Sequence, residues 1–344
     1  MNKSRYIIVS PKWGAALGGI EAWAYLIKKN LESNHCDVDI LDRSKINTCN
    51  FFSIVRYWFK TMKYDMAILM TWRMSFFLIF RLLLGKKNVI IVHGDELLNN
   101  NFFAKLIAAI IFRLSNVRVI SNSRSTENIL YSELGIKSHA IINPFIDFYA
   151  HANGIANIVP NKNKTMTFLT VTRMVKRKNI KNVLKALKLL DDNSVEFIYH
   201  LAGDGPELNE ILELIEELGL QDRVYYHGRI SENDKFELYN KADYFILPSI
   251  IDTAAGSIEG YGIVYIEANS HGVPVIAGNT GGANEAVLNG VTGITCDGSC
   301  GSIHRAILLA KDILFEKETL LEHAKKHHYL NICLPSFLRS LYEN

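Results

Sequence analysis

Two glutamates and two glycines stand close together in one stretch of the sequence. Glu259 and Glu267 are eight residues apart, and Gly260 and Gly262 lie between them, ahead of an apolar run that reads as a helix. Glycine lets a backbone approach another group closely. A helix that begins near Gly262 would also direct free N–H groups and the positive end of its dipole at that point, which favours a phosphate.

The spacing of the two carboxylates limits what they can share. Eight residues of helix rise about 12 Å, so Glu259 and Glu267 need not contact the same group. A long ligand with hydroxyl groups at both ends and phosphates between them would fit. A nucleotide sugar has that shape, and neither glutamate is predicted to act as a nucleophile.

A basic loop follows the strand predicted at Thr167–Val171. It holds Arg173, Lys176, Arg177 and Lys178, in a half of the chain that is otherwise acidic. Arginine grips diphosphate oxygens in a fork, and lysine adds a compact charge. The alternative is a solvated basic loop, but the position at a strand end favours anion binding.

The first predicted strand is followed by a glycine-rich turn, Gly14 to Gly19, that opens a helix. Gly18 and Gly19 would let the backbone approach a phosphate at the helix start. The spacing is not that of the dinucleotide-binding fingerprint. A plain strand–helix turn explains these residues equally well.

A histidine, His93, ends the strand predicted at Val89–His93. Asp95 and Glu96 follow it closely. These acids could simply begin a short helix. Because ligands of parallel sheets lie beyond the carboxyl ends of the strands, a functional role is favoured for His93.

Strands and helical patterns alternate twice along the 344 residues, which predicts two domains, each with a parallel sheet. The strands are predicted at Tyr6–Ser10, Asp37–Leu41, Met66–Met70, Val89–His93, Val117–Ser121 and Ala140–Ile142, then at Thr167–Val171, Phe197–Ala202, Val224–Gly228, Tyr244–Pro248 and Val273–Ile276. The clearest helices are predicted at Gly19–Leu31, Phe102–Leu114, Ser125–Leu134, Ile180–Leu190, Glu207–Leu218, Glu232–Ala242 and Ser302–Leu314.

The predicted fold class is therefore α/β, with two Rossmann-like domains facing across a cleft that holds the ligand. The first domain is expected over residues 1–150 and the second over 167–320. Residues 151–166 lack periodicity and are rich in Asn, Gly, Ala and Pro, so they are expected to be the linker. Residues 321–344 are expected to form a helical segment.

Composition indicates a folded protein, with 49% hydrophobic and 21% charged residues. Five scattered cysteines argue against a disulfide framework and for a reducing compartment. The apolar run after Arg5 is too short for a signal peptide. The longest apolar stretch, Met74 to Leu84, is far below the ~20 residues that span a bilayer, so a cytoplasmic location is expected.

Charge is unevenly placed. Residues 1–150 hold 19 Lys/Arg against 11 Asp/Glu, and the remainder holds 19 against 24. An aromatic and basic stretch, Phe51 to Lys63, could rest on an anionic membrane surface together with Arg73, Arg81, Lys86 and Lys87. A core-facing helix with basic outer positions is the equal alternative. A peripheral position on the inner face of the plasma membrane is thus one hypothesis.

Two acids, Asp37 and Asp39, form a D-x-D pattern of the kind that can hold a metal. They alternate within a predicted strand, so a strand face carrying two exposed acids is the favoured interpretation. No metal site is predicted.

The second half of the chain resembles a known family. Glu259-Gly-Tyr-Gly-Ile-Val-Tyr-Ile-Glu267, with Gly272-Val-Pro after it, looks like the E-x7-E region of the retaining glycosyltransferases of family 4, which have the GT-B fold. Arg173 and Lys178 match the family's donor-phosphate pair. Gly18-Gly19, His93 and Asn143-Pro144-Phe-Ile-Asp147 match in short pieces of the first half.

The resemblance implies a role for each matching residue. Glu259 would contact hydroxyls of the donor sugar, Glu267 the ribose, and Gly262 and Ile263 would offer N–H groups to the phosphates. Arg173 and Lys178 would neutralise the leaving diphosphate, and His93 would hold the donor sugar. Gly18 and Gly19 are also expected at the donor. The family's usual glycine before the arginine is Thr172 here, and residues 321–344 should include the helix that crosses back to the first domain.

The expected function is sugar transfer from a UDP- or GDP-linked donor to a lipid-linked or polysaccharide acceptor, in lipopolysaccharide, capsule or other cell-surface polysaccharide synthesis. The donor is a co-substrate. No further cofactor, metal or nucleic acid is expected. A nucleotide-sugar epimerase of the same fold and a non-catalytic nucleotide-sugar-binding subunit are the alternatives.

Overall fold

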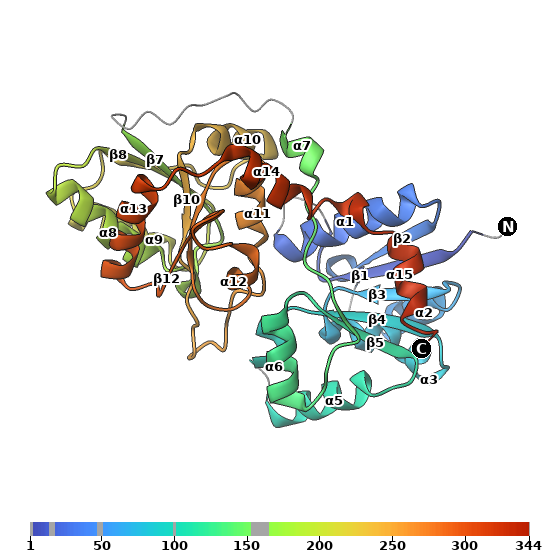
Figure 1. Ribbon diagram of the computed structural model, residues 1–344. Helices are drawn as coiled ribbons and strands as arrows, with labels where there is room; N and C mark the ends of the chain where they lie inside the picture. Colours follow the sequence, from blue (N-terminus) through green and yellow to red (C-terminus); the bar gives the residue numbers. More distant parts are fainter. Residues whose placement is uncertain (1–2, 14–17, 47–50, 99–100, 153–164, 344) are drawn as a thin grey trace. The chain divides into compact units, whose positions relative to one another are not determined.

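The computed structural model describes residues 3–13, 18–46, 51–98, 101–152 and 165–343. The chain divides into two compact units. Unit 1 comprises Met1–Ile146 and His328–Asn344, and unit 2 comprises Asp147–His327 (Figure 1). Each unit is built around its own six-stranded sheet.

The sheet of unit 1 is parallel throughout, in the order β2-β1-β3-β4-β5-β6. Its strands are β1 (Arg5–Ser10), β2 (Asp37–Asp42), β3 (Met66–Leu69), β4 (Lys87–Val92), β5 (Val117–Ser121) and β6 (Ala140–Ile141). Its helices are α1 (Gly19–Ser33), η1 (Arg43–Lys45), α2 (Phe51–Thr61), η2 (Trp72–Leu78), α3 (Ile79–Leu83), α4 (Asp95–Leu98), α5 (Phe102–Phe112), α6 (Arg124–Leu134), η4 (Tyr329–Asn331) and α15 (Leu334–Ser340).

Alternate residues of the unit 1 strands enter two separate cores, as the period of a strand requires. In β1, Tyr6 and Ile8 pack in the core that α1 covers, whereas Ile7 and Val9 pack in the core on the opposite face. Both sets are at most 2% exposed. A strand that is buried on both faces is typical of a parallel sheet with helices on both sides.

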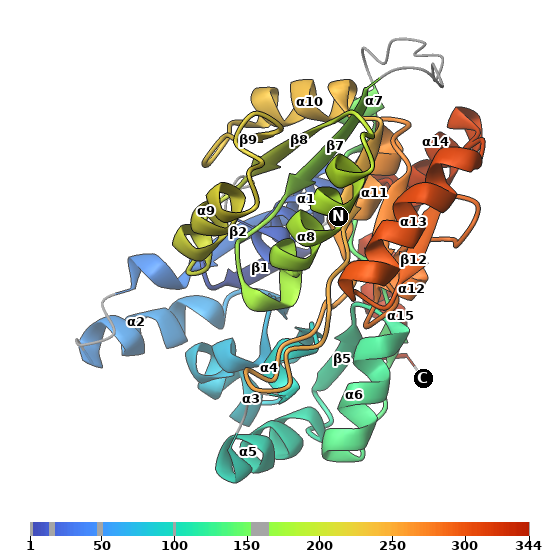
Figure 2. The ribbon, with the colours of Figure 1, turned by 90° about the vertical axis from the view of Figure 1, so that its left-hand side faces the viewer.

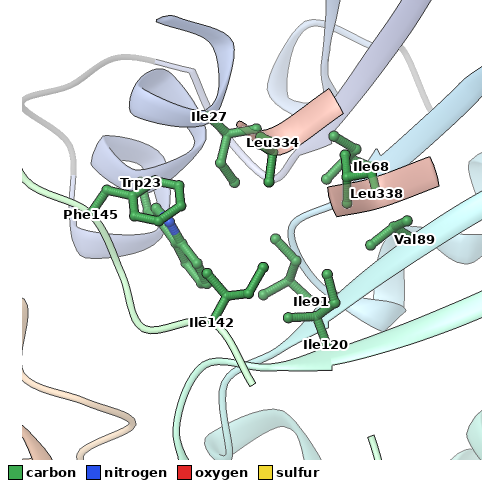
Figure 3. Close-up of a pocket in the computed structure, with 10 residues that line it drawn as sticks. All are labelled: Trp23, Ile27, Ile68, Val89, Ile91, Ile120, Ile142, Phe145, Leu334 and Leu338. Atoms are coloured by element: carbon green, nitrogen blue, oxygen red, sulfur yellow. The ribbon is translucent and has the colours of Figure 1, made fainter. Parts of the chain in front are cut away.

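The C-terminal segment His328–Asn344 belongs to unit 1, although the residues that precede it in the sequence belong to unit 2. Leu334 and Leu338 of α15 pack in the core that α1 covers and line a small apolar pocket together with Trp23 and Ile27 (Figure 3). The Tyr342 hydroxyl accepts a hydrogen bond from the Asn88 N–H at 2.9 Å. The chain thus returns to unit 1 at His328, whereas residues 321–327 of the segment expected to return belong to unit 2.

One cation that belongs to the hypothesis of a membrane-facing surface, Arg81, lies inside the protein. Arg81 is fully buried, and its guanidinium donates to the carbonyl oxygens of Thr61, Tyr64 and Lys87 at 2.6–2.9 Å. Burial lowers its pKa to about 10. The hypothesis of a membrane-facing surface was wrong to include Arg81, whose guanidinium is buried and hydrogen-bonded to three backbone carbonyls.

Unit 2 contains a second parallel sheet, in the order β12-β11-β10-β7-β8-β9. Its strands are β7 (Met166–Val171), β8 (Phe197–Ala202), β9 (Val224–Tyr226), β10 (Tyr244–Leu247), β11 (Val275–Gly278) and β12 (Gly293–Cys296). Its helices are α7 (Phe148–Ala152), η3 (Lys176–Lys178), α8 (Ile180–Asp192), α9 (Leu208–Glu217), α10 (Glu232–Lys241), α11 (Ile263–Ser270), α12 (Ala283–Ala286), α13 (Cys300–Asp312) and α14 (Lys317–Lys325).

The larger core of unit 2 lies under α8, α9 and α13, which Figure 2 shows along one face of the sheet. The apolar spacing of α8 places Ile180, Val183, Leu184 and Leu187 on a single buried stripe. Strand residues such as Phe197 meet this stripe. This packing holds the strand ends that carry the polar residues described below.

The predicted α/β fold with two Rossmann-like parallel sheets is confirmed. Sequence reasoning missed β12, since Gly293 and Thr295 interrupt its apolar pattern. The units divide between Ile146 and Asp147, and α7 contacts α11 and α14 of unit 2. Most of the linker predicted at 151–166 lies outside the described residues.

The return of α15 generates a stability prediction. Leu338 is 1% exposed, and replacing a buried leucine by alanine costs about 2–5 kcal/mol. Leu338→Ala should lower the free energy of unfolding of unit 1 by that amount in chemical denaturation. Tryptophan fluorescence reports this unit alone, since Trp13, Trp23, Trp58 and Trp72 all belong to it.

Leu330→Ala is the matched control, because Leu330 is 49% exposed in the same C-terminal segment. A surface change of this kind should stay within about 0.5 kcal/mol. Equal effects of the two substitutions would show that α15 is not part of the cooperative core of unit 1.

Candidate functional site

A polar cluster lies at the carboxyl ends of three neighbouring strands of unit 2. The 3-10 helix η3 follows β7, Ser249 comes two residues after β10, and Thr280 comes two residues after β11. The Thr280 hydroxyl donates to the Ser249 carbonyl at 3.0 Å. Strand ends of a parallel sheet gather at one edge, which is where ligands bind in such folds.

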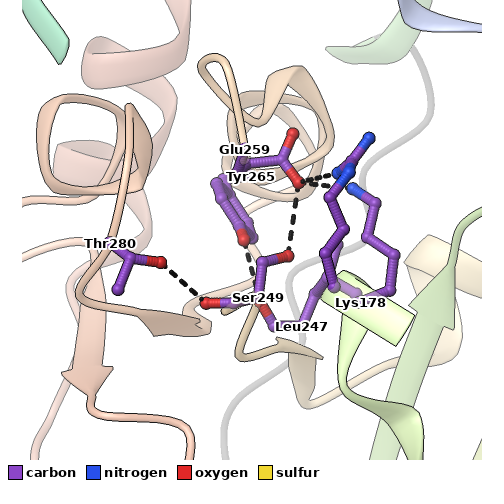
Figure 4. Close-up of polar contacts among 7 residues, drawn as sticks. Lys178, Leu247, Ser249, Glu259, Tyr265 and Thr280 are labelled. Atoms are coloured by element: carbon purple, nitrogen blue, oxygen red, sulfur yellow. Dashed lines mark hydrogen bonds and ion pairs between the residues drawn. The ribbon is translucent and has the colours of Figure 1, made fainter. Parts of the chain in front are cut away.

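Glu259 is the centre of this cluster (Figure 4). Its Oε2 accepts hydrogen bonds from Lys178 Nζ at 2.5 Å, from Arg177 Nη1 at 2.9 Å and from Ser249 Oγ at 3.2 Å. Glu259 is 8% exposed and Lys178 is 7% exposed. The three charged side chains thus form a largely buried triad with two positive charges and one negative charge.

The cations keep Glu259 ionised. Burial by itself would raise the pKa of this carboxyl, but the nearby Lys178 and Arg177 outweigh burial and hold the pKa below its ordinary value. The Ser249 hydroxyl adds a hydrogen bond to the charged form. At neutral pH the site therefore presents a carboxylate and two cations.

The backbone around the triad is fixed by buried amide contacts. Asn179 donates its side-chain N–H groups to the carbonyls of Pro248 at 3.0 Å and Gly298 at 2.7 Å. The Ile250 N–H donates to the Arg177 carbonyl at 2.8 Å. These bonds tie the loops after β7, β10 and β12 together, and so set the position of Lys178.

Two glycines allow the Glu259 loop to lie against its neighbour. A Cβ at Gly281 would come 2.3 Å from the Glu259 carbonyl oxygen, and one at Gly282 would come 2.2 Å from that of Gly260. Both distances are far below van der Waals contact. The Gly281-Gly282 pair is therefore required for the packing that holds Glu259 in place.

The start of α11 has the geometry expected of an anion site. Gly262 precedes the helix with φ 86°, a left-handed conformation that favours glycine, and Ile263 is the first helical residue. The Tyr265 hydroxyl donates to the Leu247 carbonyl at 2.8 Å and anchors the first turn on β10. The first N–H groups of a helix have no partner within it.

Glu267 lies further along α11, with different neighbours. Its Oε1 is 3.5 Å from Lys235 Nζ, and its Oε2 accepts a hydrogen bond from the Tyr239 hydroxyl at 3.4 Å. Both partners are on α10. Glu259 and Glu267 therefore lie in separate polar environments, as their spacing predicts.

The cation pair inferred from the sequence is only half present in this cluster. Lys178 reaches Glu259, but the second cation there is Arg177, a member of the predicted anion-binding loop that the family resemblance did not match to a donor-phosphate residue. Arg173 is exposed, and no ion pair from it occurs among the described residues. The loop after β7 turns through η3, and this turn directs residues 177 and 178, rather than 173, toward Glu259.

His93 in unit 1 is held as a neutral imidazole. Its Nε2 lies 2.7 Å from the Met70 carbonyl, which can only accept, so Nε2 carries the proton. Asn122 Nδ2 approaches Nδ1 at 3.4 Å. Burial lowers the pKa of His93 to about 4.

Glu96 supports the same turn. One oxygen accepts the His93 N–H at 3.3 Å, and the other contacts the Thr71 hydroxyl. Burial raises the pKa of Glu96 to about 8. Asp95 and Glu96 do begin the short helix α4, as the alternative interpretation held, yet Glu96 also fixes the backbone of His93.

The remaining sequence-predicted residues are in unit 1. Gly18 caps α1 in an extended conformation and Gly19 begins the helix, whereas Gly14 lies outside the described residues. Asp37 and Asp39 alternate on the edge strand β2, and Asp39 lies 3.6 Å from Lys63. The strand-face interpretation of these two acids fits this position.

A family model described as "Glycosyl transferases group 1" matches residues 155–327, which is half of the chain. The chain belongs to this family of glycosyltransferases. The resemblance inferred from the Glu259 to Glu267 stretch is thereby confirmed, and the matched region contains the whole Glu259 cluster.

One curated relative of this glycosyltransferase is the GDP-mannose-dependent alpha-(1-6)-phosphatidylinositol monomannoside mannosyltransferase of Mycobacterium tuberculosis. The two are 32% identical over 152 residues, which are 44% of this chain and 39% of that protein. The match thus spans about two fifths of the relative's length.

Two solved structures share the fold over nearly their whole length. A glycosyltransferase from Rickettsia africae aligns with a TM-score of 0.79 at 20% identity, covering 100% of this chain and 99% of that one. HepE of Anabaena, in complex with UDP and glucose, aligns with a TM-score of 0.74 at 18% identity, covering 98% and 99%. The GT-B fold is confirmed on this basis.

The buried triad generates a prediction about acid stability. A carboxyl whose pKa is depressed stabilises the folded state above its ordinary pKa of 4.5, and this stabilisation is lost as pH falls through the lower folded value. Lys178→Met should raise the pKa of Glu259, so unit 2 should begin to unfold at a higher pH. At neutral pH it should lose about 1.5–3 kcal/mol.

Far-UV circular dichroism would follow this transition, since unit 2 contains no tryptophan. Lys181→Met is the matched control. Lys181 is three residues after Lys178, and it makes partly exposed ion pairs with Glu207 and Glu210. Such pairs contribute about 0–1 kcal/mol. An unchanged acid transition in Lys178→Met would contradict the stabilising role of the triad.

The His93 turn generates a second pH prediction. The raised pKa of Glu96 means that its stabilising contribution is complete below pH 4.5 and is lost as pH rises through about 8. Glu96→Gln mimics the protonated acid, so it should remove this loss. Tryptophan fluorescence should show that the unfolding free energy of unit 1 falls less between pH 5 and 8 in the variant.

His93 affects stability at acid pH. Because its pKa is lowered in the folded state, the free energy of unfolding of unit 1 decreases as pH falls from 6.5 toward 4. Glu96→Gln should leave that acid limb in place. Glu32→Gln, at an exposed ion pair on α1, is the control. A Glu96→Gln variant with the parent's slope up to pH 8 would refute the assignment.

Proposed function

We propose that this protein transfers a sugar, with retention, from a nucleotide-diphosphate sugar to a lipid-linked or polysaccharide acceptor. The observation that carries the proposal is the buried Glu259, held by Arg177 and Lys178 at the strand ends of the family-matched unit. A carboxylate can orient sugar hydroxyls, and two adjacent cations can take up the charge of a departing diphosphate.

In the proposed reaction the bond between the anomeric carbon and the diphosphate oxygen breaks. A bond from that carbon to the acceptor oxygen forms on the same face, and the acceptor proton passes to the departing phosphate oxygen. Charge builds up on the diphosphate as it leaves, so stabilising it is the main catalytic task. Lys178 and Arg177 supply two positive charges there against the single negative charge of Glu259, so the triad retains one positive charge for the phosphates.

The donor is proposed to extend along α11. The N–H groups of Gly262 and Ile263 would bind phosphate oxygens at the helix start. Glu267 would accept hydroxyl groups of the ribose, with Lys235 and Tyr239 fixing its orientation. Arg173, Gly18, Gly19 and His93 are proposed to contact the donor as the family resemblance implies.

The nucleotide is proposed to be UDP or GDP. The mannosyltransferase of M. tuberculosis is named as GDP-mannose-dependent, and the HepE structures hold UDP or UDP-glucose. The acceptor is proposed from the names of two relatives, a phosphatidylinositol monomannoside mannosyltransferase and a protein named "Putative colanic acid biosynthesis glycosyltransferase". We propose that the donor sugar is the only co-substrate besides the acceptor, with no metal or further cofactor.

A panel of UDP-, GDP- and dTDP-sugars, incubated with a lipid-linked or polysaccharide acceptor, tests the transfer. Lys178→Ala and Arg177→Ala should each lower kcat/KM by about 10²–10³, the usual effect of removing one stabilising donor of transition-state charge. Lys185→Ala is the control, because Lys185 is an exposed lysine on the neighbouring helix α8. Transfer that survives both substitutions unchanged would contradict the assignment.

Incubation with donor alone separates the competing functions. An epimerase of this fold would convert the sugar without an acceptor, whereas a transferase requires one. A non-catalytic subunit would bind the donor in calorimetry and turn over nothing. If no nucleotide sugar of the panel is bound and none is turned over, all three functions are refuted.

A further inference from the structure

Helix α5 of unit 1 exposes most of its apolar side chains. Its exposed residues are Phe102, Phe103, Leu106, Ile107 and Ile110, which are 74%, 72%, 47%, 52% and 58% exposed. Their spacing places them on one face of the helix. The opposite side packs on the sheet through Ala108 and Phe112, which are buried.

The helix carries almost no charge that would make this face soluble. Lys105 is its only charged residue, and its ammonium group pairs with Glu133 of α6. Folding explains the buried side of α5 but gives no reason for five large apolar side chains in water. A contiguous apolar face of this kind marks an interaction surface.

The end of α3 also exposes large apolar side chains. Leu83 and Leu84 are 75% and 65% exposed. Asn116, in the turn between α5 and β5, donates its amide to the carbonyls of Leu82 at 3.0 Å and Lys86 at 2.9 Å, so this turn is joined to the end of α3. Figure 1 and Figure 2 both place α3 and α5 at the same end of unit 1.

Positive charge surrounds these apolar residues along the chain. Lys86 and Lys87 follow Leu84 closely, Arg113 follows α5 directly, and all three are exposed. Residues 43–118 contain twelve Lys/Arg against three Asp/Glu. One of those acids, Glu96, is buried, and burial raises its pKa to about 8. The surface thus combines apolar side chains with an excess of cations.

We propose that the apolar face of α5, with Leu83 and Leu84, inserts into the surface of a lipid bilayer that contains anionic lipids. Apolar side chains would enter the boundary of the acyl chains, and the cations would meet the headgroups. A second copy of this surface is a poorer occupant, because it would bring the same positive charges together.

The helix lies on the membrane in this arrangement and does not cross it. Eleven residues of helix rise about 16 Å, against about 30 Å for the hydrocarbon core. Among the described residues, no helix is long and apolar enough to span a bilayer. The position also differs from the one predicted around Phe51 to Lys63. There Ile54 is buried, and Trp58 packs against Phe76 and Phe80.

Sedimentation with vesicles tests the proposal without donor or acceptor, so its outcome is independent of the transfer reaction. The parent protein should bind vesicles of phosphatidylcholine mixed with phosphatidylglycerol more strongly than phosphatidylcholine alone. The double variant Phe102→Ser/Phe103→Ser should lower the partition coefficient roughly tenfold or more, since it removes two large apolar groups. Circular dichroism and tryptophan fluorescence should show that both proteins are folded.

Leu309→Ser is the matched control, because Leu309 is 55% exposed on α13 of unit 2 and should not affect vesicle binding. Lys86→Glu should weaken binding to the vesicles that contain phosphatidylglycerol and leave binding to pure phosphatidylcholine vesicles unchanged. Raising the ionic strength from about 0.01 M to about 0.15 M shortens the screening length from about 30 Å to about 8 Å. Binding to the anionic vesicles should therefore fall with salt but not vanish, as the apolar part is not screened.

Three outcomes would overturn the proposal. The parent protein fails to bind either vesicle; the Phe102→Ser/Phe103→Ser variant binds as the parent does; or gel filtration shows self-association that this variant abolishes while vesicle binding is unchanged. The last result would assign the face to a second copy of the chain.

Discussion

The buried carboxylate of Glu259 is the constraint on which the site depends. A charge that leaves water must be paired and hydrogen-bonded, since an isolated one is too costly to keep. Lys178 and Arg177 meet that requirement only because η3 turns them toward Glu259. The amide contacts of Asn179 and the close approach at Gly281 and Gly282 then hold the loops that carry the three charges.

At the turn after β4 in unit 1, two ionisable groups respond to burial in the opposite way. His93 and Glu96 are close in the sequence and in the fold, and burial is the largest influence on both pKa values, which shift toward the neutral form. A neutral imidazole with its proton on Nε2 offers Nδ1 as an acceptor. The Glu259 cluster of unit 2 is therefore charged, whereas His93 of unit 1 is a neutral imidazole.

Periodicity in the sequence predicted both sheets, because parallel strands buried on both faces have near-continuous apolar runs. It could not identify β12, whose glycine and threonine break the run, although packing against β11 supplies the context. Motif spacing singled out Glu259 and Glu267, and the family resemblance singled out Arg173 and Lys178. It did not separate Arg173 from Arg177, because which cation reaches Glu259 depends on the turn of η3, and four cations in six residues fit several turns equally well.

Helix α5 shows why a helical pattern is an incomplete prediction. Its apolar residues occur on every side, so the sequence predicts a helix without saying which face is buried. The sheet has room for only one side of an element packed on its face. The other side then exposes Phe102 and Phe103. Contact with water does not explain large apolar residues at these positions, whereas contact with a partner does. Helix α15 does not expose its leucines in this way, because Leu334 and Leu338 both enter the core of unit 1. The contrast between these two helices separates apolar residues that fold the chain from apolar residues that are left for a partner.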